Sequence, residues 1–520
     1  MVRVPPIYQP HRFFCVSRFL LLIALLAVSA QAERINQEGR ILGPEPVVTT
    51  PLLFNTAQAD AVVSAMQIMP LDSAWNEDIS TRPLLANSDA MIAQISSELL
   101  SSRRTLRAFY EMNYALVPDS QPLTSINFLD YPEQSDPSPW PIPSLMPVET
   151  WPRETGSLTN AQWQQDINDE GGDRHSIVVM PGAGMLWETW QARLVGSQWQ
   201  ASNGAKFDLR TNTLRPAGWT SGDAAGLPMF PALVRYDECQ RGMVEHAMRI
   251  VVKHTRREYL YPATHHASVP STTDPNIPAM GQRLRLKASF TIPANWTIYE
   301  KAVCLGLKKY GALVADNGNF FSISVTPDDR YPSNAFNNLS SIGIDNFEVV
   351  QSTGATEGPR SPGAPTASAG ADLETVLPSS IALSGSATGS AISAQWTKYS
   401  GPGSVTFGNA AQTSTTASFS LPGTYTLMLH VRDGVHAVAR DAVIVNVKVP
   451  ATITRVSNGV TITFPSFSGQ TYRVERTTDL ANGPWTTLAD SLVGTGSVIT
   501  VTDTSALATS AAFYRVQTLP

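Results

Sequence analysis

Apolar and polar positions alternate along much of the chain, which is the pattern of half-buried β-strands. The alternation is clearest in the last third, for example over residues 424–431. Turn residues bound that segment, with Pro422-Gly423 before it and Asp433-Gly434 after it. The last third is therefore predicted to consist of small all-β modules.

The N-terminal part shows the same pattern from residue 176 onward, mixed with a few helical segments. Apolar runs at 176–180 and 185–190 predict a β-hairpin. Helical spacing of apolar residues occurs at 57–68, 88–113 and about 297–311. We therefore expect a mainly β, multidomain protein whose N-terminal domain is a β-sandwich or jelly-roll-like fold with a few helices.

The first residues have the features of an export signal. Three arginines accompany an apolar run at residues 19–28, and a small-x-small pattern follows at residues 30–32. The apolar run is shorter than the roughly 20 residues that a membrane span needs, which disfavours the alternative of a retained anchor. We expect residues 1–32 to be a signal peptide, and the protein to be secreted, extracellular or at the cell surface, with no further membrane span.

Composition divides the remainder into four segments. Residues 33–352 are expected to form a carbohydrate-active domain, and residues 353–365 form a linker rich in glycine and proline. Two β modules follow, at 366–449 and 450–520, separated near Val449-Pro450.

Four short motifs occur in the first of these modules, at residues 369–372, 396–403, 422–425 and 431–434. With these motifs the module resembles the polycystic-kidney-disease (PKD) type β-sandwich, an immunoglobulin-like extracellular fold. The resemblance implies a spacer or a weak glycan or protein binder, without catalysis of its own.

Two further resemblances concern the rest of the chain. The C-terminal module, through residues 469–472, 475–480 and 513–516, resembles short modules in secreted proteins of Verrucomicrobia-like bacteria. It is expected to cap the chain or to bind a substrate or surface. The N-terminal domain resembles an uncharacterised group of secreted bacterial proteins, through residues 70–76, 214–221, 242–247, 261–265, 278–283 and 307–318. That resemblance implies one coherent domain and no particular reaction.

Charge and cysteine content narrow the function classes. The chain has 43 acidic and 37 basic residues and no basic run, which argues against nucleic-acid binding. Beyond the signal peptide two cysteines remain, Cys239 and Cys304. They form a disulfide or stay as separate buried thiols, and their number excludes a structural metal site built on cysteine pairs.

Five of the eight histidines fall between residues 175 and 266, among several acidic residues in loop-like segments. Imidazoles and carboxylates in one region are what acid–base chemistry needs. No metal-ligand spacing is present, so no metal or cofactor is expected. The candidate catalytic residues are Glu238, His246, Asp316, Asp223 and His265. In the alternative interpretation, each carboxylate caps a turn or pairs with an arginine.

Sugar rings stack on aromatic side chains, and acidic sugars pair with cations. The candidate substrate-binding residues are accordingly Trp219, Tyr236, Tyr261, Arg283, Lys309 and Asn317. The sequence favours a secreted enzyme that degrades an extracellular polysaccharide or cell-surface glycan, as a glycoside hydrolase or a polysaccharide lyase. The alternatives are a non-catalytic lectin or adhesin, and a structural protein of the cell surface.

Overall fold

A computed structural model describes residues 33–165, 172–267, 272–508 and 511–519. The predicted signal peptide, residues 1–32, lies outside the described residues. Within the described ranges, no helix combines the length and the apolar character that a membrane span requires.

The main sheet of the N-terminal part has six strands. Its order is β14 (Phe347–Val349), β11 (Arg283–Leu286), β12 (Ala312–Asn317), β10 (Met248–Val252), β13 (Phe321–Val325) and β2 (Leu106–Tyr110). Strands β10 and β12 pair in parallel, as do β13 and β2, and the other neighbours are antiparallel. Strand β2 is thus an edge strand that joins the sheet through a partner more than 200 residues away in sequence.

A second sheet has five strands and a third has three. The five-stranded sheet has the order β1 (Leu52–Leu53), β3 (Ala115–Leu116), β5 (Ser176–Met180), β6 (Met185–Trp190) and β9 (Asn203–Asp208). The three-stranded sheet has the order β4 (Ile126–Phe128), β8 (Gln198–Ala201) and β7 (Arg193–Val195). Strands β5 and β6 are antiparallel neighbours, so the predicted hairpin is confirmed.

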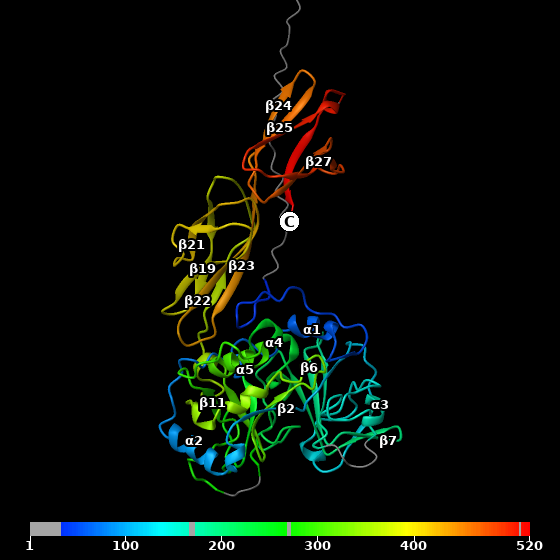
Figure 1. Ribbon diagram of the computed structural model, residues 1–520, viewed down its shortest axis with the longest axis vertical. Helices are drawn as coiled ribbons and strands as arrows, with labels where there is room; N and C mark the ends of the chain where they lie inside the picture. Colours follow the sequence, from blue (N-terminus) through cyan, green and yellow to red (C-terminus); the bar gives the residue numbers. More distant parts are fainter. Residues whose placement is uncertain (1–32, 166–171, 268–271, 509–510, 520) are drawn as a thin grey trace, which may run out of the picture. The chain divides into compact units, whose positions relative to one another are not determined.

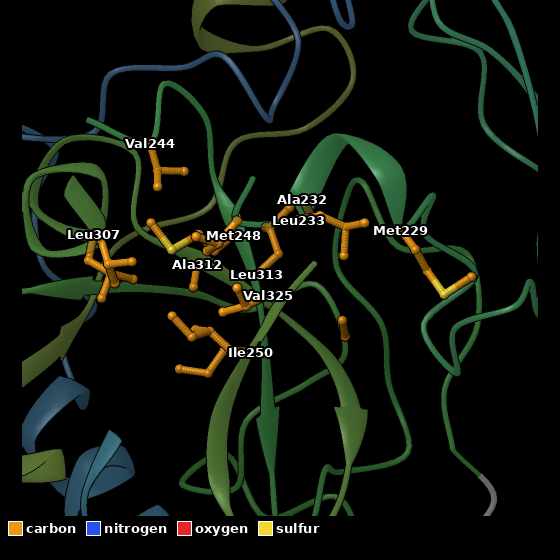
Figure 2. Packing of buried hydrophobic residues seen from close by; sticks show 14 of the residues in the cluster. Met229, Ala232, Leu233, Val244, Met248, Ile250, Leu307, Ala312, Leu313 and Val325 are labelled. Carbon is orange, nitrogen blue, oxygen red and sulfur yellow. The ribbon is translucent and has the colours of Figure 1, made fainter. Parts of the chain in front are cut away.

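The six-stranded and five-stranded sheets share one hydrophobic core. Val179 of β5 and Leu186 of β6 belong to the same buried cluster as Ile250 of β10. Figure 2 shows part of this cluster, in which Met248 and Ile250 lie near Leu313 and other apolar residues of the six-stranded sheet. The mainly β, multidomain prediction is confirmed. The parallel pairs distinguish the domain from a jelly roll, whose strands are antiparallel.

Five α-helices accompany the sheets in the described ranges: α1 (Ala57–Ser64), α2 (Ser88–Ser97), α3 (Asn160–Trp163), α4 (Tyr236–Arg241) and α5 (Ile298–Lys309). Helices α4 and α5 pack side by side (Figure 1). The predicted helix near 297–311 is confirmed as α5, which begins with a capping box formed by Thr297 and Glu300. The spacing predicted an apolar face of Ile298, Ala302, Leu305 and Leu307. Ala302 and Leu307 are buried, whereas Ile298 and Leu305 are exposed and Val303 and Cys304 are buried instead.

The predicted helix over 88–113 is wrong beyond residue 97. A 3-10 turn at Ser101–Arg103 and then strand β2 occupy its second half. Serine side chains compete for backbone hydrogen bonds and weaken helices, and pairing with β13 stabilises an extended conformation at Leu106–Tyr110. The 3-10 helices are η1 (Ser101–Arg103), η2 (Pro132–Gln134), η3 (Phe230–Ala232), η4 (Asn337–Ser341), η5 (Ile344–Asn346), η6 (Gly358–Arg360) and η7 (Thr504–Ala508).

The expected linker at 353–365 contains the short helix η6, and its first half packs on the N-terminal domain. The Arg360 side chain is 3% exposed and forms an ion pair with Glu77, with its Nη2 3.3 Å from Oε2. Its guanidinium also lies over the ring of Tyr261, at 4.8 Å.

Residues 366–449 form a β-sandwich with its own core. One sheet has the order β16 (Leu373–Val376), β23 (Ala439–Lys448), β22 (Gly423–Arg432) and β19 (Ser393–Ser400), and the other the order β17 (Ile381–Ser384), β21 (Ser414–Phe419) and β20 (Val405–Phe407). A two-stranded pair, β15 (Thr366–Ser368) and β18 (Ser386–Thr388), completes it. Trp396 and Tyr425 lie at the centre of the core and are almost fully buried.

The C-terminal module has two three-stranded antiparallel sheets. Their orders are β24 (Thr452–Val456), β25 (Gly459–Pro465) and β28 (Val498–Asp503), and β27 (Thr486–Val493), β26 (Thr471–Thr477) and β29 (Phe513–Leu519). Its small core contains Phe464 and Tyr472.

Candidate functional site

A buried arginine, Arg249, is the centre of the site. Its Nε and Nη2 donate to the two carboxylate oxygens of Asp223, each at 2.9 Å, and its Nη1 donates to Ser324 Oγ at 2.6 Å. Burial disfavours the charged form of Arg249, but Asp223 outweighs this effect and raises the pKa of Arg249. The guanidinium therefore remains a fixed positive charge in the interior.

Strand alternation explains why Arg249 occupies this place. Met248, Ile250 and Val252 of β10 belong to the hydrophobic core, so Arg249 projects to the opposite face of the sheet. Between Ile250 and Val251 the register with β12 shifts by one residue, and this bulge pairs Val251 with Asp316. The same face thereby carries Arg249 and Asp316.

Glu111, directly after β2, is the first of two carboxyl groups beside this arginine. Its Oε2 lies 3.5 Å from Arg249 Nη1 and accepts a short hydrogen bond from Ser324 Oγ. Its side chain is 24% exposed, so it is in partial contact with solvent. Dense surroundings on the other sides desolvate the carboxylate and raise the pKa of Glu111 to about 7, with the Glu149 charge adding to the rise and Arg249 opposing it.

Asp316 is the second carboxyl group, beside the other terminal nitrogen of the guanidinium. Its Oδ2 lies 3.6 Å from Arg249 Nη2, and its side chain is 27% exposed. Desolvation, followed by repulsion from Asp223, raises the pKa of Asp316. Because Glu111 and Asp316 each lie close to a terminal nitrogen of one planar guanidinium, their nearest oxygens are within about 10 Å of each other.

Three carboxyl groups thus surround one arginine. If Glu111, Asp223 and Asp316 were all ionised, their three negative charges would exceed the single positive charge of Arg249 by two, in a poorly hydrated part of the domain. A proton retained on Glu111 or Asp316 relieves this repulsion. The arrangement can hold one carboxylic acid and one carboxylate at neutral pH, which is what general acid–base catalysis requires.

A buried histidine holds the loop that carries Asp223. His175 Nδ1 lies 2.9 Å from Glu149 Oε2, and its Nε2 lies 2.8 Å from the carbonyl oxygen of Gly222. Both ring nitrogens face acceptors, so both carry protons. Burial opposes this charge, but the ion pair with Glu149 outweighs it and raises the pKa of His175 to about 9. His175 is therefore a charged anchor for Gly222-Asp223.

Three of the five predicted catalytic residues lie in this region. Asp223 and Asp316 meet at Arg249, as described above. His265 lies beside the Asp223 loop, where its Nδ1 donates to the carbonyl oxygen of Ala224 at 2.7 Å. Burial lowers the pKa of His265, which keeps its ring neutral.

The other two predicted catalytic residues, Glu238 and His246, lie elsewhere. Glu238 is on α4, is 2% exposed, and has Oε1 2.7 Å from Arg235 Nη2 and Oε2 3.0 Å from His246 Nε2. Burial disfavours its charge, but Arg235 and His246 outweigh this effect and lower the pKa of Glu238 to about 2. The expected convergence of all five residues is therefore wrong: Glu238 forms a buried ion pair with Arg235 and a hydrogen bond with His246.

Of the predicted substrate-binding residues, Asn317 lies nearest the carboxyl pair, since it follows Asp316 on β12. Its Oδ1 accepts a hydrogen bond from Thr255 Oγ1 at 3.2 Å. Trp219 is half-buried, and the Arg215 guanidinium lies 5.5 Å from its ring centroid.

The remaining predicted binding residues are occupied by structural contacts. Tyr261 lies under the Arg360 guanidinium. Arg283 is 5% exposed and donates to two backbone carbonyls, at 2.7 and 2.8 Å. Tyr236 packs among other aromatic rings, and Lys309 forms an ion pair with Glu38 at 2.6 Å. These four side chains hold the domain together.

The predicted disulfide is absent, because Cys239 and Cys304 are both free, buried thiols. Cys239 lies on α4 and Cys304 on the neighbouring α5, and each side chain belongs to the hydrophobic core. The second interpretation, two separate buried thiols, is therefore the one found. Among the residues with described positions, no group of three or more His, Cys, Asp or Glu side chains is arranged to hold a metal ion.

The candidate site residues chosen from the sequence left out Glu111, Glu149 and His175, and Arg249 was named only as the partner of a carboxylate in the alternative interpretation, which is its role with Asp223. Arg249 does leave a signal, because it is the lone charged residue in an apolar strand, and charges in such positions are rarely unpaired. Glu111 leaves none, since the segment before it was predicted to be helical.

Comparisons with known proteins concern mainly the first C-terminal module. Residues 369–447 match a family model that describes a PKD domain. The solution structure of the PKD domain from the KIAA 1837 protein is 33% identical, over 17% of this chain and 89% of that chain, with a TM-score of 0.14. A nucleoside hydrolase-related hypothetical protein from Saccharophagus degradans, associated with carbohydrate metabolism, is 16% identical over 26% of this chain and 35% of its own, with a TM-score of 0.16. No curated protein matches the chain. The match of residues 369–447, which includes the predicted motifs, identifies this module as a PKD domain.

Proposed function

We propose that the protein is a secreted enzyme that degrades an extracellular polysaccharide, with Glu111 and Asp316 as its acid–base pair. The observation that carries this proposal is the position of two partly exposed carboxyl groups beside the two terminal nitrogens of one buried arginine, both with a raised pKa. Strongly perturbed carboxyl groups that solvent can reach are typical of catalytic sites.

The chemistry follows from the two protonation states. The protonated carboxyl group donates its proton to the glycosidic oxygen of the leaving sugar, while the ionised one activates a water molecule or attacks the sugar directly. Arg249 stabilises the ionised partner, and Asp223 fixes the guanidinium in place. A separation within about 10 Å accommodates both the retaining and the inverting mechanism.

A polysaccharide is the proposed substrate because of the rest of the chain. The first residues predict export, and the PKD domain is of a kind typical of extracellular proteins. In this proposal the two C-terminal modules space the catalytic domain from a surface or bind the polymer weakly.

The test measures hydrolysis of a panel of polysaccharides by the full secreted chain. Glu111→Gln and Asp316→Asn each remove one proton-transfer group, so each is expected to lower kcat by about 10² to 10⁴. Glu374→Gln, at a half-exposed ion pair in the PKD domain, is the control and leaves kcat unchanged. The wild-type profile of kcat/KM against pH should be bell-shaped with its maximum near neutrality, and each variant should lose one limb.

The alternatives predict different results in the same assays. An unsaturated, ultraviolet-absorbing product would identify a lyase. Binding to a glycan without turnover of any polymer, unchanged in Glu111→Gln, would support a lectin or adhesin and reject the enzyme.

A further inference from the structure

The sheet face that carries the carboxyl pair continues toward the edge strand β2. Arg107 of β2 pairs with Ser322 of β13, Ser322 pairs with Val251 of β10, and Val251 pairs with Asp316 of β12. Paired residues of neighbouring strands project to the same face. With strands about 4.8 Å apart, the Cα atoms of Arg107 and Asp316 are about 14 Å from each other.

Aromatic side chains lie beside this row. Phe109 is two residues beyond Arg107 on the same face of β2, and it pairs with Ser324. Its ring meets that of Phe320 edge to face, with centroids 5.1 Å apart. Both rings are partly exposed, so a sugar face can pack against them.

Three cations belong to the same part of the sheet, and one of them contacts a ring directly. The Arg103 guanidinium lies 4.3 Å from the centroid of Phe320, and Lys253 Nζ donates to Asn319 Oδ1 at 2.6 Å. Arg107 Nη2 donates to a backbone carbonyl at 3.2 Å. Across the described ranges, none of these three cations forms an ion pair with a carboxylate, in contrast to the buried arginines Arg249 and Arg235.

We propose that this basic-aromatic strip, formed by Arg103, Arg107, Phe109, Lys253 and Phe320, binds acidic groups of the substrate. The inference rests on the proposed function and gives its substrate class: a polysaccharide that carries uronate or sulfate groups. Unpaired cations attract such groups, and the rings offer a surface to the sugar between them.

The carboxyl pair itself does not attract an acidic polymer, so the positive charge of the strip is what such a substrate requires for binding. Glu111, Asp223 and Asp316 together repel an anionic polymer, and Arg249 is already engaged by Asp223. The strip supplies positive charge on the path from the sheet edge to these groups. An acidic chain lying along the strip would place its next sugars over the carboxyl pair, and a neutral chain would leave the cations unused.

The test compares three kinds of polymer with the full secreted chain: a polyuronate, a sulfated glycan and a neutral glycan. The double variant Arg107→Gln/Lys253→Gln is expected to raise KM for the acidic polymer about three- to tenfold, with kcat unchanged, because exposed ion pairs contribute modestly to binding. Raising the salt concentration should weaken wild-type binding more than binding by the variant. Arg210→Gln, an exposed cation outside the strip, is the matched control and leaves KM unchanged.

Cleavage confined to the polyuronate or to the sulfated glycan, with the expected rise in KM, supports the inference and identifies the acidic group. Preference for the neutral glycan, or an unchanged KM in the double variant, overturns it. The two proposals can also fail separately. If the wild type binds an acidic polymer but cleaves no polymer, and the double variant loses this binding, then the strip is a binding site and the proposed enzyme activity is rejected.

Discussion

Asp223 and Arg249 form a two-point ion pair in the interior of the N-terminal domain, with both nitrogen–oxygen distances at 2.9 Å. The Asp223 side chain is 1% exposed and that of Arg249 is 4% exposed. The pair joins a loop to strand β10 and orients the guanidinium between Glu111 and Asp316. Stability and the chemistry of the site thus depend on the same contact.

Asp223→Asn should therefore lower both the stability of the fold and the activity of the site. The substitution breaks the charged two-point contact at 2.9 Å and leaves compensation of Arg249 to Glu111 and Asp316, which lie farther away at 3.5 and 3.6 Å, so we expect a loss of up to about 3–5 kcal/mol. Urea unfolding followed by circular dichroism measures this loss. Glu374→Gln, which breaks the exposed pair with Lys448, should cost less than about 1 kcal/mol. Similar losses in the two variants would contradict the buried role of Asp223.

Glu111 should make the folded state less stable as the pH rises. Its pKa is about 7 in the folded protein against 4.5 in the unfolded chain, so the folded state binds the extra proton between these values. Stability from this group is present below about pH 4.5 and is lost as the pH rises through 7, by about 1–3 kcal/mol.

Glu111→Gln, which is neutral at every pH, should flatten this part of the dependence. The measurement is the free energy of unfolding of wild type and variant from pH 5 to 8. Parallel curves would show that the pKa of Glu111 is unshifted.

Glu238→Gln should reduce stability and leave kcat unchanged. The carboxylate is buried between Arg235 and His246, away from the carboxyl pair. Its pKa of about 2 lies below the unfolded value of 4.5, so its contribution is present above pH 4.5 and is lost as the pH falls toward 2. Thermal unfolding near neutral pH and near pH 3 tests this, because the difference in Tm between wild type and variant should be smaller at the lower pH. If the variant has the stability of the wild type but no turnover, Glu238 is a catalytic residue and the structural role is wrong.

Cys239 and Cys304 should both be unreactive thiols in the folded protein. Burial raises the pKa of each thiol, that of Cys304 to about 12, so almost no thiolate is present at neutral pH. A thiol reagent should label both residues only after denaturation, as peptide mass mapping can establish, and a reducing agent should not change Tm. Failure to label them in denaturant would indicate a disulfide.

The sequence was sufficient for features that depend on neighbouring residues. Alternating apolar positions and turn residues predicted the hairpin β5–β6 and the strands of residues 366–449, because strands and tight turns follow from local side-chain patterns; the resemblance of four motifs identified those strands as a PKD-type sandwich. Apolar spacing likewise predicted α5. Asp223 and Asp316, two of the five candidates chosen from polar, turn-rich segments, do lie beside the same arginine.

Only the tertiary structure decided which side chains meet. Glu111 reaches Arg249 because β2 pairs in parallel with β13, more than 200 residues later, and no local pattern encodes that pairing. The packing of α4 in the core likewise decided that the local Arg235–Glu238 pair is buried and that the two cysteines are separate thiols. Local sequence thus determined the strands and turns, while the order of strands in the six-stranded sheet determined the site, because a contact between distant segments depends on the packing of the whole domain.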